Sequence, residues 1–174
     1  MSPPFDDGIF DFIIAENLLH HLAYPIKFFR EAHRILKPGG FLIIQESNAS
    51  FFLKLILRLM KHEGYSMNTD VFDEKTPCTD CNDPWSGNNA ISNLLFDDNK
   101  KFHSSVPFFK IEHSSFSEFF ILLNSGGTIA KTFYIPLPRF ILRIIDFIDN
   151  ILTRLFYKTF ALQRQVVLKK LEMP

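Results

Sequence analysis

Two adjacent histidines, His20 and His21, are the clearest candidates for chemistry in the sequence. They follow an apolar run, Phe10 to Ala15, which is typical of a strand buried on both faces. An imidazole titrates near neutral pH, so it can accept a proton from a hydroxyl or an amine. Either histidine is therefore a candidate catalytic base. The structural alternative is that one of them packs in its helix and hydrogen-bonds to the backbone.

The two cysteines, Cys78 and Cys81, form a lone Cys-x-x-Cys pair. A structural zinc site needs four ligands and usually two such pairs, and no histidine lies at a fixed spacing from this pair. Two cysteines also make no disulfide framework. The sequence therefore predicts no metal site, an incidental pair in a loop, and a reducing, cytoplasmic compartment.

A tryptophan among aspartate and asparagine residues is the third candidate feature. Asp83, Trp85, Asn88 and Asn89 lie within residues 62–107, which show little periodicity. We interpret this stretch as a long irregular insertion, of the kind that serves as a lid or a binding loop. An exposed tryptophan in polar surroundings is a platform of the kind that binds sugars, so these four residues are candidate substrate contacts. Trp85 could equally pin the insertion to the core.

The elements that would position the histidines form a βαβ unit. After the strand, "ENLLHHL" predicts a short helical turn or a loop, and Pro25 opens a helix with apolar residues at helical spacing. Pro38-Gly39-Gly40 ends that helix, and Phe41 to Gln45 form the next buried strand. We expect the two strands to be parallel, with a right-handed crossover.

The rest of the chain predicts further helices and strands. "SFFLKLILRLMK" is a helix capped by Ser50, and "NNAISNLLFDD" contains a short helix inside the insertion. A strand, "FFKIEHSSF", is followed by the helix "SEFFILLNSGG", with Gly126 or Gly127 as its C-cap. Residues 138–158 form a long amphipathic helix, and "QRQVVLKKL" forms a last strand.

Composition narrows the classes of function. The net charge is zero, which argues against a nucleic-acid partner. The start of the sequence has no signal-peptide pattern, and no uncharged apolar run reaches the ~20 residues that span a bilayer. Phenylalanine is frequent, with 21 residues, and the helices at 51–60 and 138–158 are rich in apolar side chains. We expect these helices to be core or to line a hydrophobic acceptor site. The alternative is peripheral contact with a membrane.

The words "FDDGIFD", "LLHHL", "REAHRILKPGG" and "FLIIQE" stand at spacings that closely resemble the class I S-adenosylmethionine-dependent methyltransferases, in their small-molecule branch. Together they cover about 43 residues. Two later words, "LLNSGG" and "IPLPRFILRIID", resemble more loosely the C-terminal part of methyltransferases from bacterial surface-polysaccharide loci.

The resemblance implies a fold and a cofactor site. Sheets of that family have the strand order 3-2-1-4-5-7-6, and Phe10 to Ala15 would be strand four and Phe41 to Gln45 strand five. The expected fold class is α/β: a partial Rossmann-like methyltransferase sheet, strands four to seven, in a single domain, 1–174, truncated at its N-terminus. Ala15, Glu16 and Asn17 would face the methionine part of S-adenosylmethionine.

The glycine-rich turn and the ribose-binding acidic residue of the family have no counterpart in the sequence. Two interpretations follow: the chain is a fragment, or a partner chain supplies the missing strands. An unpaired strand-four edge would also favour a homo-oligomer. We predict methyl transfer to a small acceptor, such as a sugar or a lipid-linked saccharide. The alternatives are a non-catalytic binding or regulatory subunit, and a peripheral membrane protein.

Overall fold

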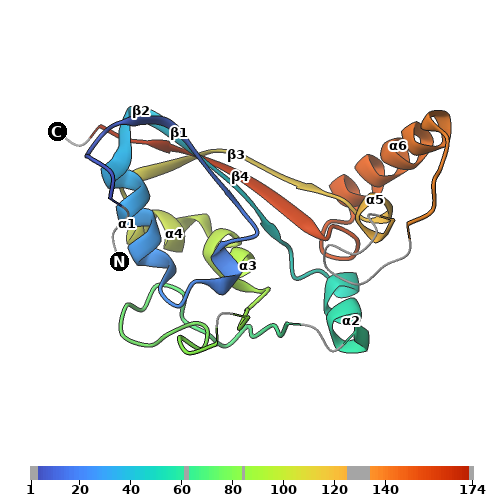
Figure 1. The fold of residues 1–174 in the computed structure, drawn as a ribbon, viewed down its shortest axis with the longest axis horizontal. Coiled ribbons are helices and arrows are strands. Elements are labelled where there is room, and N and C mark those ends of the chain that lie inside the picture. Colours follow the sequence, from blue (N-terminus) through green and yellow to red (C-terminus); the bar gives the residue numbers. More distant parts are fainter. Residues whose placement is uncertain (1–3, 61–62, 84, 125–133, 173–174) are drawn as a thin grey trace.

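The computed structural model describes residues 4–60, 63–83, 85–124 and 134–172. A four-stranded sheet in the order β1-β2-β4-β3 runs through the molecule (Figure 1). Its strands are β1 (Phe10–Glu16), β2 (Leu36–Ser47), β3 (Phe109–Ser117) and β4 (Gln163–Lys170). β1 and β2 are parallel, and β4 is antiparallel to both β2 and β3. This order matches the expected sequence of strands four, five, seven and six, so the predicted fold class is confirmed.

The helix α1 (Pro25–Ile35) makes the predicted crossover from β1 to β2. It ends two residues earlier than expected, because Leu36 is fully buried and already pairs with Phe10. The Pro38-Gly39-Gly40 stretch therefore lies within the first part of β2. A Cβ at Gly40 would lie 3.0 Å from the carbonyl oxygen of Asp11, so the close approach of the two strands favours glycine there.

One face of the sheet carries the main core. The 3₁₀ turn η1 (Leu19–His21), α1, α3 (Ile91–Phe96) and α4 (Asn99–Ser105) contribute to it, and Figure 1 shows the three helices on the same side of the sheet. α3 and α4 belong to the predicted insertion at 62–107, where the short helix was expected. Whether that stretch also acts as a lid stays a prediction.

The opposite face of β1 is exposed. Ile13 and Ala15 point into the core, whereas Phe12 and Ile14 are 61% and 72% exposed. The prediction that Phe10 to Ala15 is buried on both faces is therefore wrong. The physical reason is that, within the described ranges, every helix that packs on β1 lies on one side, so alternate residues of the strand face solvent.

A second group of helices, α2 (Phe51–Met60), α5 (Phe120–Leu123) and α6 (Arg139–Leu155), lies at one end of the sheet (Figure 1). Leu53 and Leu57 of α2 are buried with Phe119 and Leu162, and Ser50 caps α2 as predicted. α5 starts three residues later than expected, and its predicted glycine cap at 126 or 127 falls outside the described residues.

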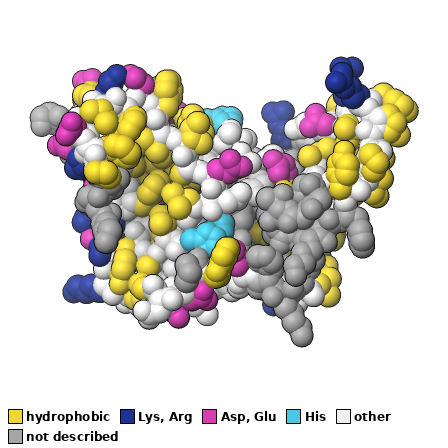
Figure 2. All heavy atoms as spheres, in the orientation of Figure 1, with side chains coloured by type: hydrophobic (Ala, Val, Ile, Leu, Met, Phe, Trp, Pro, Cys, Tyr) yellow, Lys and Arg dark blue, Asp and Glu magenta, His cyan; other side chains and the backbone are white. Residues whose placement is uncertain are grey.

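The two residues of α6 that are fully buried, Asp149 and Thr153, are polar. Most of its apolar side chains are exposed, and four others, at positions 141, 142, 145 and 152, are half-buried. Figure 2 shows hydrophobic side chains gathered at this end of the molecule. The expectation of a core role is therefore confirmed for part of α2 and wrong for α6. None of the described helices is long and apolar enough to cross a membrane. The exposed apolar residues of α6 are Phe140, Ile144, Phe147, Ile148, Ile151 and Leu155.

Candidate functional site

Parallel pairing of β1 and β2 brings the carboxyl ends of both strands to one edge of the sheet. Asn17 follows β1 with a φ of 47°, a left-handed conformation that asparagine tolerates. Its N–H donates to the carbonyl of Gln45, at a distance of 2.9 Å. This turn sends the chain into η1, and η1 places His20 above the end of β2.

Glu46, near the end of β2, is the buried acid of the site, with 1% of its surface exposed. Its carboxylate accepts hydrogen bonds from the backbone N–H groups of Leu19 at 2.6 Å, His20 at 3.3 Å and Ser47 at 2.9 Å. It also contacts Nδ1 of His20 through a short hydrogen bond. Glu46 therefore fixes both the backbone of η1 and the ring of its central histidine.

The His20 imidazole has a pKa above its ordinary value. Burial lowers this pKa, but the hydrogen bond and the charge of Glu46, together with the charge of Glu63, outweigh burial. Because Glu46 holds Nδ1, the second ring nitrogen, Nε2, is the atom left for chemistry. Such a histidine is a stronger proton acceptor than a free imidazole.

His21 and Glu63 complete a cluster with His20. Nε2 of His20 lies 3.4 Å from Oε2 of Glu63, and Nε2 of His21 lies 3.6 Å from Oε1 of the same residue. The Nδ1 atom of His21 lies 3.0 Å from the carbonyl oxygen of Ser86. The two rings are 4.1 Å apart between centroids. The structure therefore brings both predicted histidines together around one carboxylate.

The predicted substrate residues lie in the loop that packs on this cluster. The N–H of Asn88 donates to the carbonyl of His20 at 2.8 Å, and Nδ2 of Asn89 donates to Glu63 at 3.4 Å. Both asparagines are buried. Asp83 accepts a hydrogen bond from the N–H of Trp85, whose side chain is 80% exposed. This exposure contradicts the alternative that Trp85 pins the loop to the core, and sugar contact stays a prediction.

The predicted cofactor residues lie beside an acidic, polar edge of the sheet. Ala15 is buried and Glu16 is exposed. Burial raises the pKa of Glu118, and the charges of Glu16 and Asp149 raise it further. Nε2 of Gln163 lies 3.5 Å from Oδ1 of Asn17, and the buried Oε1 of Gln163 has no hydrogen-bond partner among the described residues. This edge therefore offers acceptors for a cationic or hydrogen-bond-donating ligand.

Cys78 and Cys81 lie in the loop that precedes Asp83. Cys78 is buried, and burial, followed by the charges of Asp70 and Asp73, raises its pKa to about 11. Cys81 is exposed, and neither cysteine is in a disulfide. A thiol with so high a pKa is a poor nucleophile and a poor metal ligand at neutral pH.

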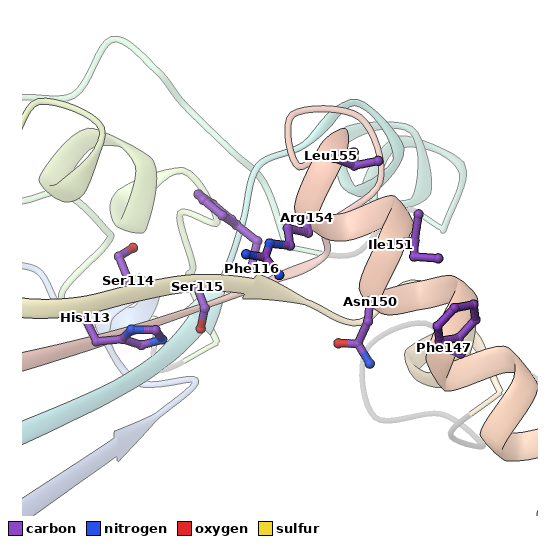
Figure 3. Close-up of a pocket in the computed structure, with 9 residues that line it drawn as sticks. All are labelled: His113, Ser114, Ser115, Phe116, Phe147, Asn150, Ile151, Arg154 and Leu155. Atoms are coloured by element: carbon purple, nitrogen blue, oxygen red, sulfur yellow. The ribbon is translucent and has the colours of Figure 1, made fainter.

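A separate groove of about 870 Å³ lies between β3 and α6 (Figure 3). Ser115 of β3 lines it from one side and Asn150 and Arg154 of α6 from the other. In the sheet, Ser115 pairs with Gln165, which in turn pairs with Gln45 of β2, the neighbour of Glu16. Three strand spacings, roughly 14 Å, thus separate the groove from the end of β1. The groove is not part of the histidine cluster.

Sequence reasoning found both histidines but missed Glu46 and Glu63. A signal for Glu46 was present, because "FLIIQE" ends with an acid at the carboxyl end of a strand predicted to be parallel to β1. Glu63 carried no such signal, since it lies in an irregular stretch whose path depends on tertiary contacts.

Comparison with known proteins links the first part of the chain to one family. Residues 1–44 match the family described as a methyltransferase domain. These residues include β1, the Asn17 turn, η1, α1 and most of β2. No curated protein matches the chain.

Solved methyltransferases are similar to the chain in shape. One from Methanosarcina mazei is 18% identical with a TM-score of 0.46, and the match covers 99% of this chain and 64% of the Methanosarcina protein. One from Archaeoglobus fulgidus is 18% identical with a TM-score of 0.45, and the match covers 95% of this chain and 62% of the Archaeoglobus protein. A putative methyltransferase of Haloferax volcanii, solved with the activator Trm112, is 14% identical with a TM-score of 0.43, covering 99% and 58%. The chain therefore spans less than two thirds of the length of each of these proteins.

Proposed function

We propose that this chain transfers a methyl group from S-adenosylmethionine to a small acceptor at the carboxyl ends of β1 and β2. The match of residues 1–44 to a methyltransferase domain carries the proposal. Those residues are also the ones that build the end of β1 and position His20 and His21. Sequence similarity and site geometry therefore point to the same edge of the sheet.

The residues at this edge fit the cofactor's charge. S-adenosylmethionine carries a positive sulfonium and an ammonium group, and the edge holds the acidic side chains of Glu16 and Glu118. A ligand ammonium at the Asn17 turn would supply the donor that Oε1 of Gln163 lacks within the described structure. In this proposal Ala15, Glu16 and Asn17 hold the methionine part of the cofactor, largely through the backbone.

The bound cofactor would supply an electrophilic methyl group, so the protein's task is to place the acceptor in line with it and remove its proton. In this proposal Nε2 of His20 takes that proton, while Glu46 holds the ring and stabilises its charged form. The exposed ring of Trp85 adjoins Ser86, which contacts His21, and this favours a sugar or a lipid-linked saccharide as the acceptor.

The exposed side of β1 supports a second proposal about partners. β1 is an edge strand of the described sheet, and its Phe12 and Ile14 side chains are largely exposed. An apolar edge of this kind pairs readily with another chain. We propose that a second copy, or a chain that supplies further strands, covers it. Measurement of the oligomeric state by light scattering therefore comes before any ligand titration.

Calorimetric titration of the whole chain with S-adenosylhomocysteine tests the cofactor proposal. We expect micromolar binding. Asn17→Gly preserves the left-handed turn and should bind as the wild type does, whereas Asn17→Val strains the turn and should weaken binding. A folded wild-type chain of known oligomeric state that binds no S-adenosylhomocysteine would overturn the proposal. Equal binding by the two variants would remove the Asn17 turn from the site.

Methyl transfer itself is tested with labelled S-adenosylmethionine and a panel of sugar acceptors. His20→Gln should lower kcat by about 10²-fold or more while leaving S-adenosylhomocysteine affinity within a few-fold, because the proton acceptor is lost and the Asn17 turn is not. Unchanged kcat in this variant would exclude His20 as the base.

A further inference from the structure

The cluster of His20, His21 and Glu63 is built like a metal centre. One donor atom from each of these residues lies within 4.8 Å of the others. We propose that the cluster binds one divalent transition-metal ion of the zinc class, through Nε2 of both histidines and the Glu63 carboxylate. The sequence predicted no metal site, because the lone pair of Cys78 and Cys81 lacks the further ligands that zinc needs. Glu63 was not a candidate, since it has no spacing signal relative to the histidines.

The hydrogen bonds at the far side of each ring set its tautomer. The carbonyl oxygen of Ser86 can only accept, so the bond to His21 places the hydrogen on Nδ1. The Glu46 carboxylate holds Nδ1 of His20 in the same way. In the neutral rings both lone pairs therefore lie on Nε2, the atoms that face Glu63. Metal-binding histidines almost always have this kind of outer partner, a carboxylate or a backbone carbonyl.

The donor separations suit a small tetrahedral ion. Metal–ligand bonds of about 2.0–2.1 Å at tetrahedral angles place neighbouring donors roughly 3.3–3.5 Å apart. Nε2 of His20 lies 3.4 Å from Oε2 of Glu63, and Nε2 of His21 lies 3.6 Å from Oε1, the other oxygen of that carboxylate. One donor atom of each residue lies within 4.8 Å of the others, so side-chain rotation must draw the three donors together around an ion. A nitrogen-rich donor set favours zinc-class ions over magnesium or calcium.

The surroundings hold the three ligands in place yet leave a way in. Glu63 accepts a hydrogen bond from Asn89, and the adjacent Gly64 is bridged to Asn88. A Cβ at Gly87 would lie 2.9 Å from Oε2 of Glu63 and 3.3 Å from the His20 ring, so glycine leaves room for the cluster. The His21 side chain is 30% exposed, against 8% for His20 and 17% for Glu63. An ion would therefore enter past His21.

Three protein ligands leave a fourth position for water or for a ligand oxygen, which is the composition of catalytic rather than structural zinc sites. A bound ion and a proton taken from the methyl acceptor would occupy the same lone pair on Nε2 of His20, so they compete for it. The metal site does not depend on the proposed methyl transfer, because ion binding is measured directly.

The test is titration of the whole chain with Zn²⁺ and Co²⁺ after removal of bound metal with a chelator. A Cys78→Ser, Cys81→Ser background removes the competing thiols. We expect one ion per chain, a rise in Tm with Zn²⁺, and the visible absorption of tetrahedral Co²⁺. Co²⁺ should also quench the single tryptophan, Trp85, which adjoins Ser86. A folded chain that binds neither ion would overturn the proposal. It would mean that hydrogen bonds alone hold His20, His21 and Glu63 together.

Variants locate the site. Glu63→Gln and His21→Gln should each weaken Zn²⁺ binding by more than the roughly 10–100-fold that loss of an outer partner costs. Gly87→Ala keeps all three donors but crowds Glu63, and should weaken binding to a smaller extent. His103→Gln, at an exposed position of α4, is the matched control and should bind as the parent does. Equal losses in the control and in Glu63→Gln would contradict this site.

Discussion

Two helices, α1 on the covered face of the sheet and α6 at its end, fully bury different kinds of residue. On the covered face, Phe29 of α1 is fully buried and meets three further rings edge-on, those of Phe96, Phe102 and Phe109. At the other end, Phe147 of α6 is 66% exposed. The two buried residues of α6 are polar instead, Asp149 and Thr153.

Different interactions attach the two helices. α1 packs through apolar area removed from water. α6 is attached through Asp149, whose two carboxylate oxygens accept from the N–H groups of Phe119, Phe120 and Ile121 at 3.0–3.1 Å. Both helices are strongly amphipathic in sequence. Amphipathicity therefore identifies a helix with two unlike faces, but it does not decide which face packs against the same chain.

The largest expected effect comes from Phe29→Ala. It removes a ring from the centre of the aromatic cluster, and a cavity there should lower the free energy of unfolding by about 3–5 kcal/mol. Phe147→Ala removes the same ring from an exposed position and should change it by less than about 0.5 kcal/mol. Urea unfolding followed by circular dichroism measures both. Comparable losses would mean that α6 is buried in solution, for instance against a second copy.

Asp149→Ala tests the attachment of α6. It leaves three backbone donors at the start of α5 without their acceptor, and we expect a loss of about 2–3 kcal/mol in local stability. Amide hydrogen exchange across residues 119–124 and 139–155 should report it as faster exchange there, with β1 and β2 unchanged. Asp149→Asn keeps one acceptor oxygen and should lose less.

The control for Asp149 is Asp146→Ala, one turn earlier on the same helix, whose side chain is exposed. It should leave exchange in α5 unchanged. If Asp146→Ala loosens α5 as much as Asp149→Ala does, the loss comes from helix propensity and not from the buried hydrogen bonds.

Much of the sheet could be predicted because its signals are local. The β1–α1–β2 unit follows from apolar runs, Pro25 and the glycine pair, and β3 and β4 follow from short apolar segments of their own. Burial of both faces of β1 could not be predicted correctly, since an apolar run does not say what covers Phe12 and Ile14. The face of α6 that packs against the chain could not be predicted for the same reason. It depends on a contact between Asp149 and the backbone at Phe119, which is distant in sequence.

The candidate site also contains residues that the sequence could identify and residues that it could not. His20 and His21 follow a strand end and could be found from sequence alone. Glu63 could not, because its position depends on the contacts of Gly64 and Asn89 across an irregular loop. Asn88 and Asn89 are buried and hydrogen-bonded to that loop and to η1, contacts that the sequence did not specify, and their contact with a substrate stays a prediction. Polar side chains in a loop predict hydrogen bonds, but not their partners.

The smallest expected effect is a pH dependence at His33, a half-buried residue beside the aromatic core. His33 packs on Phe108 and Phe109, and its buried Nε2 has no hydrogen-bond partner within the described ranges. Burial, and then the charge of Lys170, lower the pKa of His33. The unfolded chain therefore takes up the proton first as the pH falls through about 6.5, and stability is lost below that pH.

His33→Phe keeps a ring in the same place and removes the group that takes up this proton. The free energy of unfolding should therefore fall less steeply between about pH 7.5 and pH 5, which spans the ordinary histidine pKa of about 6.5. Other histidines titrate in both proteins, so the informative quantity is the difference between variant and wild type at each pH, measured by urea unfolding. That difference should move in favour of the variant as the pH falls. His103→Phe, exposed on α4, should show no such change. A constant difference for His33→Phe would mean that its imidazole is reached by water, and that the core is less closed beside β3 than at Phe29.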